Sequence, residues 1–294
     1  MSDFLRDIAY LLRPHQWVKN LLVLAPPFFG GALFTNGSMF LKMFLAFVGF
    51  SLASSTAYII NDITDIEHDR HHPQKRQRPL SSGRISILTA VVLCFITLAL
   101  SIAASYTIGL DFLMITLAYL ALSLSYSFYL QRIEIIDVFC IAAGFVLRIE
   151  AGGIASGIEV SNWLLLTTFL LSLLLAFGKR RHELALHHDP EKPFREVLQR
   201  YNTNFLDTTL SIFATTAIVT YAIYTVEIES RIFLLTVPFA IYGVLRYMYL
   251  VQTDTRGDPT ESLFQDRPLL FSVVVWFLIT TAVIYFKDIS GFIE

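Results

Sequence analysis

The chain has 294 residues, of which 55% are hydrophobic and only 16% are charged, and its mean hydropathy is +0.59. A soluble globular chain carries about 25% charged residues, so much of this surface must face something other than water. Disordered, collagen-like and disulfide-stabilised chains are excluded, since Gly (14), Pro (10) and Cys (2) are few. The formal net charge of −2 argues against a nucleic-acid partner.

Apolar stretches of about 20 residues, the length that crosses a bilayer, follow one another along almost the whole chain. They predict an all-α polytopic membrane protein with nine transmembrane helices and short connections. We expect residues 1–294 to form a single transmembrane domain, with polar loops at about 61–84 and 179–203. The predicted spans lie at about 17–34, 39–60, 85–106, 109–130, 135–157, 161–178, 204–226, 231–250 and 268–286.

The basic residues predict the orientation in the membrane. Eighteen of the 22 Lys and Arg residues lie on one side of these spans, and only Lys42, Arg231 and Lys287 lie on the other. Because cytoplasmic segments carry the excess of Lys and Arg, we expect the N-terminus and both polar loops in the cytoplasm. An odd number of spans then places the C-terminus outside.

Lys19 and Asn20 lie about one turn inside the first predicted span. A cation beside lipid is costly unless it has a partner. Lys19 therefore either binds a lipid phosphate or extends its ammonium group to the membrane surface.

Asn61, Asp65 and Asp69 are four residues apart at the end of the second predicted span. On a helix they share one face, each about 6 Å above the last. Stacked oxygen ligands suit Mg²⁺, which keeps several bound waters and also coordinates substrate phosphates. Like charges at this spacing destabilise a helix, so a bound cation explains them better than a solvated helix end. Asp62, about 100° round the helix, is expected to serve a second ion or to contact the ligands.

Lys75, Arg76 and Arg78 follow these acids directly. Beside a bound Mg²⁺ they suit a substrate rich in phosphate, since Arg binds phosphate oxygens bidentately. The alternative is an ordinary cytoplasmic loop in contact with lipid headgroups. The neighbouring carboxylates favour phosphate binding.

Arg148 lies inside the fifth predicted span. A central charge costs at least about 2.5–3.5 kcal/mol on insertion scales, so Arg148 needs an anionic partner. That partner is either a substrate phosphate or an acid such as Glu150 or Asp137.

Lys179, Arg180 and Glu183 end the sixth predicted span. They form either a second wall of a cytoplasmic cavity or a cluster of charges that stops membrane insertion. The sequence alone favours neither interpretation.

The Asn-Asp-x-x-Asp-x-x-x-Asp pattern at 61–69 resembles the UbiA superfamily of intramembrane prenyltransferases, and within it the branch that transfers phosphoribosyl groups to polyprenyl phosphates. In aromatic prenyltransferases of this superfamily a second Asp-rich motif usually ends the sixth span. Here residues 179–183 read Lys-Arg-Arg-His-Glu, which favours direct cationic contact with phosphate and leaves the number of metal ions open. The other segments that carry the resemblance are 13–20, 72–83, 126–129, 136–153, 257–261 and 266–267.

The resemblance implies a helical fold around a central cavity open to the cytoplasm and laterally to lipid. It also implies a transferase of the plasma membrane that takes part in cell-wall precursor synthesis, with 5-phosphoribosyl 1-diphosphate as donor, a decaprenyl-type polyprenyl phosphate as acceptor and Mg²⁺ as cofactor. A homo-oligomer is compatible with it. The predicted metal ligands are Asn61, Asp65 and Asp69; the predicted catalytic residues are Asp65, Asp69 and Arg148; the predicted substrate-binding residues are Lys19, Asn20, Asp62, Lys75, Arg76, Arg78, Lys179, Arg180 and Glu183.

Two alternatives use the same acidic site. One is transfer of a polyprenyl chain from its diphosphate to an aromatic acceptor, against which the basic cluster at 179–183 argues. The other is a cation transporter or channel. That class predicts charged or broken helices near the bilayer midplane, whereas here the acids gather at one edge and only Arg148 and Glu150 lie deeper.

Overall fold

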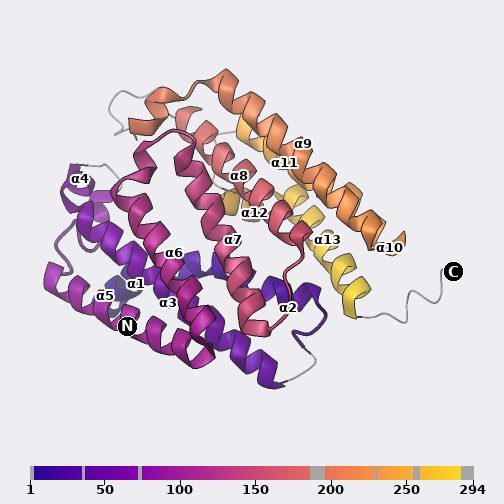
Figure 1. Ribbon diagram of the computed structural model, residues 1–294. Coiled ribbons are helices and arrows are strands. Elements are labelled where there is room, and N and C mark those ends of the chain that lie inside the picture. The colour runs from indigo at the N-terminus through magenta and orange to yellow at the C-terminus, as the bar shows by residue number, and fades with distance from the viewer. Residues whose placement is uncertain are drawn as a thin grey trace. The chain divides into compact units, whose positions relative to one another are not determined.

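The computed structural model describes residues 3–34, 37–71, 75–185, 196–228, 231–253 and 259–285. These ranges are helical and contain no β-strand, as predicted (Figure 1). The long apolar helices are α3 (Gly37–Thr64), α5 (Ile87–Ile108), α6 (Leu110–Phe128), α7 (Ile136–Ser156), α8 (Asn162–Ala185), α9 (Thr203–Glu227), α11 (Val237–Thr253) and α13 (Arg267–Tyr285). The shorter helices are α1 (Asp3–Leu12), α2 (Ala25–Phe29), α4 (Ile66–His71), α10 (Arg231–Leu234) and α12 (Pro259–Gln265), with 3₁₀-helices η1 (Pro14–Leu24), η2 (Lys75–Gln77), η3 (Leu130–Arg132) and η5 (Glu196–Arg200).

The chain forms two compact units. Unit 1 comprises Met1–Gln131 and Gly144–Val160, and unit 2 comprises Arg132–Ala143 and Ser161–Glu294. Helix α7 contributes its first turns to unit 2 and the rest to unit 1. The expectation of a single transmembrane domain stays a prediction.

Eight of the nine predicted spans coincide with helices that are long and apolar enough to cross a membrane. The exception is the segment at 17–34, which forms the 3₁₀-helix η1 and the five-residue helix α2. Pro26 and Pro27 lie in the first turn of α2, and proline cannot donate a backbone hydrogen bond within a longer helix. The count of nine is therefore not confirmed for the described residues, and the outward C-terminus that an odd count requires stays a prediction.

Helix α3 is the central helix of unit 1 and packs against α5, α6, η1 and α1. Small buried residues line its middle, among them Gly49, Ser51 and Ser54, and such residues let helices approach closely. A Cβ atom on Gly49 would lie 3.2 Å from that of Ala104 in α5. Helices α5 and α6 are joined by Gly109 alone, at φ 154°, a conformation that only glycine adopts readily.

In unit 2, helix α8 packs against α9, and α11 packs against α13 and α9. The core between α8 and α9 includes Leu173, Phe177 and Leu206. The side chain of Asn202 accepts a hydrogen bond from the Phe205 N–H and so caps α9.

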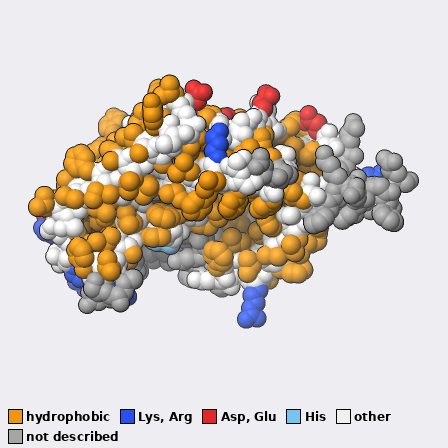
Figure 2. Space-filling view, turned by 90° about the horizontal axis from the view of Figure 1, so that it is seen from below, with side chains coloured by type: hydrophobic (Ala, Val, Ile, Leu, Met, Phe, Trp, Pro, Cys, Tyr) orange, Lys and Arg blue, Asp and Glu red, His pale blue; other side chains and the backbone are white. Residues whose placement is uncertain are grey.

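Hydrophobic side chains predominate on the surface drawn in Figure 2, and few charged side chains stand among them. On α5, for example, Leu88 is 73% exposed and Phe95 is 67% exposed. Exposed apolar surface of this extent marks contact with lipid or another apolar partner. With eight apolar helices, the chain is a multi-pass membrane protein.

A substitution at Gly152 tests the packing of α7 against η1. A Cβ atom there would overlap the backbone carbonyl of Val23 and lie 2.9 Å from Cδ of Pro26. We expect Gly152→Ala to destabilise the protein by about 1–3 kcal/mol, the usual cost of overpacking, and to lower its melting temperature in detergent. Gly37→Ala is the control, because a Cβ atom on Gly37 meets nothing within 4 Å. Equal melting temperatures for the two variants would contradict this packing.

Candidate active site

The acidic motif continues the helical path of α3 beyond its end. Helix α3 ends at Thr64, and α4 begins at Ile66. The Asp65 N–H donates to the Asn61 carbonyl at 3.0 Å, and the Asp69 N–H donates to the Asp65 carbonyl at 2.8 Å. The spacing of four residues thus keeps helical backbone hydrogen bonding through the motif.

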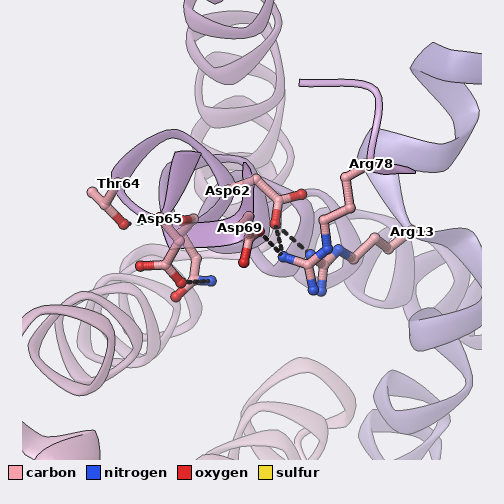
Figure 3. Close-up of polar contacts among 7 residues, drawn as sticks. Arg13, Asp62, Thr64, Asp65, Asp69 and Arg78 are labelled. Atoms are coloured by element: carbon pink, nitrogen blue, oxygen red, sulfur yellow. Dashed lines mark hydrogen bonds and ion pairs between the residues drawn. The ribbon is translucent and has the colours of Figure 1, made fainter. Parts of the chain in front are cut away.

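Two of the acids are held by arginines (Figure 3). Nη1 of Arg78 donates to Oδ1 of Asp62 at 2.9 Å and to Oδ2 of Asp69 at 2.6 Å. Nη2 of Arg13 donates to the same Oδ1 of Asp62 at 2.5 Å. Asp62 and Asp69 are 2% and 0% exposed. Such buried carboxylates must be paired, so this cluster ties α3, α4 and the loop after η2 together.

Asp65 points away from this cluster in Figure 3 and contacts the side chain of Asn61, whose amide donates to it at 3.1 Å. It is half-buried. Among the described residues Asp65 makes no ion pair. Of the three aspartates, it is the one whose carboxylate charge a bound cation can compensate.

The described residues contain no group of three or more Asp, Glu, His or Cys side chains that could hold a metal by themselves. Mg²⁺ does not require such a cage, since it is commonly held by one or two carboxylates together with substrate phosphates. Asp65 and the amide oxygen of Asn61 supply oxygen ligands of this kind, and Asp69 follows Asp65 by four residues, with its N–H bonded to the Asp65 carbonyl. The residues present fit Mg²⁺.

The predicted phosphate-binding residues of this loop lie in different environments. Arg78 binds Asp62 and Asp69, whereas Arg76 is exposed. The side chain of Lys75 lies outside the described part of the structure. Arg13, which sequence reasoning did not select, belongs to the cluster through its ion pair with Asp62 and has a left-handed backbone conformation at φ 53°.

Arg148 is 6% exposed and is held by neutral groups of unit 1. Its Nε donates to Oδ1 of Asn20 at 2.7 Å, its Nη1 to the Gly144 carbonyl at 2.6 Å and its Nη2 to the Tyr119 hydroxyl at 3.0 Å. Its guanidinium also lies 4.8 Å from the centre of the Tyr119 ring. No carboxylate among the described residues pairs with it. An ionisable side chain inside a membrane helix is a candidate functional site.

Asn20 joins Arg148 to helix α3. Its amide donates to Ser51 at 3.1 Å, and its oxygen accepts from Ser54 at 3.3 Å. Ser54 shares a helical face with Asn61 and Asp65, which follow it by seven and eleven residues. The Arg148 network and the acidic motif therefore lie on one polar face of α3, about 10 Å apart along its axis. Lys19 is half-buried at the start of this region.

Unit 2 contains a separate buried cluster. Nε of Arg180 donates to Oδ2 of Asp137 at 2.6 Å, and Nη1 of Arg180 donates to Glu183 at 2.9 Å. Arg180 is 1% exposed and Asp137 is fully buried. Asp137, considered above as a partner of Arg148, thus pairs with Arg180 instead. Lys179 is half-buried on the same helix.

Tyr201 fixes this second cluster and was not predicted from the sequence. Its hydroxyl donates to Oδ1 of Asp137 at 2.9 Å and accepts from the Ile135 N–H at 2.6 Å. Burial raises the pKa of Tyr201, and the charge of Asp137 raises it further, so the hydroxyl keeps its proton. Ile135 has a φ of 67°, an unusual conformation for a β-branched residue that Tyr201 holds in place.

These features define a polytopic helical membrane protein with two clusters of ion pairs and a buried arginine network among its described residues. The sequence profile described as the UbiA prenyltransferase family matches residues 23–265. The chain belongs to this family.

Known relatives match almost the full chain. A decaprenyl-phosphate phosphoribosyltransferase of Corynebacterium glutamicum is 35% identical over 93% of this chain and 85% of its own length. A protein of the same name from Mycobacterium tuberculosis is 30% identical over 97% of this chain and 96% of its own length. In fold, the chain is similar to a UbiA homologue from Archaeoglobus fulgidus bound to DMAPP and Mg²⁺, with a TM-score of 0.72 at 21% identity over 94% of this chain and 98% of the homologue.

Proposed function

We propose that this protein is a transferase that moves a 5-phosphoribosyl group from 5-phosphoribosyl 1-diphosphate to a polyprenyl phosphate of the decaprenyl type. The observation that carries the proposal is the similarity, at 30–35% identity and along nearly the whole chain, to relatives named for this reaction. The acidic motif supports it, because a diphosphate leaving group requires compensation of its negative charge.

The reaction exchanges one bond at the anomeric carbon of the ribose. An oxygen of the lipid phosphate forms a bond to C1, and the bond from C1 to the diphosphate oxygen breaks. The electron pair of that bond leaves with diphosphate. A phosphate monoester is already anionic near neutral pH, so no general base is needed, and catalysis rests on positioning and charge stabilisation.

In unit 1, we assign Asn61, Asp65 and Asp69 to a Mg²⁺ ion that would neutralise charge on the donor diphosphate. Asp62 and Arg78 hold the motif in place, and Arg76 and Lys75 remain predicted ligands of the donor phosphates. Support for these roles comes from the ion pairs of Asp62 and Asp69 and the freedom of Asp65 from such pairs among the described residues.

We assign the lipid phosphate to Arg148, assisted by Asn20 and Lys19. The supporting observation is that Arg148 is a buried guanidinium whose described partners are all neutral. In unit 2, Lys179, Arg180 and Glu183 remain predicted substrate-binding residues. The enzyme would lie in the plasma membrane with its N-terminus and its active site facing the cytoplasm.

A transfer assay tests the proposed function. The purified protein in detergent receives radiolabelled 5-phosphoribosyl 1-diphosphate, a polyprenyl phosphate and Mg²⁺, and label is counted in the organic phase. We expect lipid-soluble label that EDTA abolishes, because a Mg²⁺ ion held by Asn61, Asp65 and Asp69 would supply charge stabilisation for the diphosphate leaving group.

A second arm supplies polyprenyl diphosphate and an aromatic acceptor to the same preparation. In this arm the polyprenyl diphosphate carries the label. If the protein remains monodisperse on gel filtration and transfers label only in this arm, the proposed reaction would be aromatic prenyl transfer instead of phosphoribosyl transfer.

A further inference from the structure

A small polar cavity in unit 1 has no role in the proposed mechanism. It has a volume of about 150 Å³ and is lined by Tyr10, Arg13, His15 and Arg78. Pockets for whole small molecules begin at about 300 Å³. This cavity therefore has room for one phosphoryl-sized group rather than for a complete phosphoribosyl diphosphate.

The two arginines that line the cavity keep donors for a ligand. Arg13 binds its carboxylate partner through Nη2, and Arg78 binds both of its partners through Nη1. A guanidinium carries five N–H donors in a fixed plane, so each arginine has further N–H groups beyond these contacts. Asp62 and Asp69 hold the two planes still, which reduces the entropy lost when a ligand binds.

The other two lining residues also suit an anion. The Tyr10 hydroxyl can donate a hydrogen bond, and a His15 ring nitrogen can do so in either protonation state. Partial burial lowers the pKa of His15, and the positive charges of Arg13 and Lys19 lower it further. A cavity whose neighbouring charges disfavour another cation is a favourable place for an anion.

We propose that this cavity is a subsite for a phosphate monoester, namely the 5-phosphate of the donor; this rests on the proposed function. The donor carries phosphate at both ends of its ribose, and only the diphosphate end has been assigned to the acidic motif. Arg78 contacts Asp69 of that motif and also lines the cavity, so the two anion sites are neighbours.

The lipid acceptor ends in the same phosphate monoester chemistry. The position of the cavity favours the water-soluble donor. Its lining comes from the end of α1, the start of η1 and the loop after η2, all of which lie outside the eight apolar helices. Arg148, by contrast, lies within one of these helices.

Binding of ribose 5-phosphate to the full-length protein in detergent tests the subsite without catalysis. Equilibrium dialysis with radiolabelled ribose 5-phosphate measures affinity for His15→Gln and Tyr10→Phe, both exposed positions whose substitution leaves the core intact. We expect each variant to bind about tenfold more weakly, the effect of one hydrogen bond to a charged group. In the transfer assay, KM for 5-phosphoribosyl 1-diphosphate should rise to a similar degree, with KM for polyprenyl phosphate unchanged.

Arg84→Gln is the matched control. It removes a cation from the same loop, but Arg84 pairs with Asp7 at 3.0 Å and does not line the cavity. Wild-type affinity for ribose 5-phosphate in both cavity variants would overturn the subsite. A rise in KM for polyprenyl phosphate alone would overturn its assignment to the donor.

The binding readout separates this inference from the proposed function. Weaker ribose 5-phosphate binding in the cavity variants of a protein without transferase activity would support the subsite and sink the proposed reaction. Normal transferase activity in cavity variants whose ribose 5-phosphate binding is unchanged would support the proposed reaction and overturn the subsite.

Discussion

Asp65→Asn should lower kcat/KM for 5-phosphoribosyl 1-diphosphate by about 10²- to 10³-fold, the loss expected when one group that stabilises developing charge is removed. The substitution preserves shape, and the new amide oxygen can still accept the hydrogen bond from Asn61 that is 3.1 Å long in the wild type. What it removes is the carboxylate charge. Because no ion pair among the described residues uses that charge, the fold should lose little stability.

The Mg²⁺ dependence identifies the cause of the loss. If Asp65 holds the ion, the Mg²⁺ concentration for half-maximal transfer should rise in Asp65→Asn, while the melting temperature stays close to that of the wild type. Glu67→Gln is the matched control, since Glu67 is an acid two residues further along with a side chain that is 79% exposed. An Asp65→Asn enzyme with an unchanged Mg²⁺ requirement would remove Asp65 from the metal site.

Local spacing predicted the acidic motif, but not the partners of its members. Asn61, Asp65 and Asp69 follow one another through helical hydrogen bonds, which depend only on nearby residues. The ion pair between Arg13 and Asp62 joins positions 49 residues apart. Arg13 also has a left-handed backbone conformation, and no spacing rule contains such information.

The same difference between local and long-range information separates the eight predicted spans that the structure confirms from the predicted span at 17–34, which it does not confirm. Hydropathy alone located eight helices, because in lipid a helix satisfies its own backbone hydrogen bonds. The segment at 17–34 is also mostly apolar, but it contains two prolines and packs against α3. Likewise, the sequence indicated that Arg148 needs an anion, whereas only the fold shows that Asp137 is already paired with Arg180.

Replacing Arg148 should abolish function without destabilising the fold. We expect Arg148→Met to lower kcat/KM for polyprenyl phosphate by about 10²-fold or more, because the charge-assisted hydrogen bonds to the lipid phosphate are lost. Its melting temperature should equal or exceed that of the wild type. An isolated buried charge is costly, and two of its partners keep another contact, since Asn20 and Tyr119 both bond to Ser54.

Arg246→Met supplies the opposite case in the same protein. Arg246 binds Asp266 through two hydrogen bonds of 3.1 and 2.7 Å, and Asp266 is 7% exposed. Removing this arginine takes the cation away from a buried carboxylate, so Arg246→Met should lower the melting temperature. Thermal unfolding in one detergent compares the two variants directly. A loss of stability in Arg148→Met as large as that in Arg246→Met would make Arg148 a structural residue, because an arginine kept for an anionic substrate should not be needed by the empty fold.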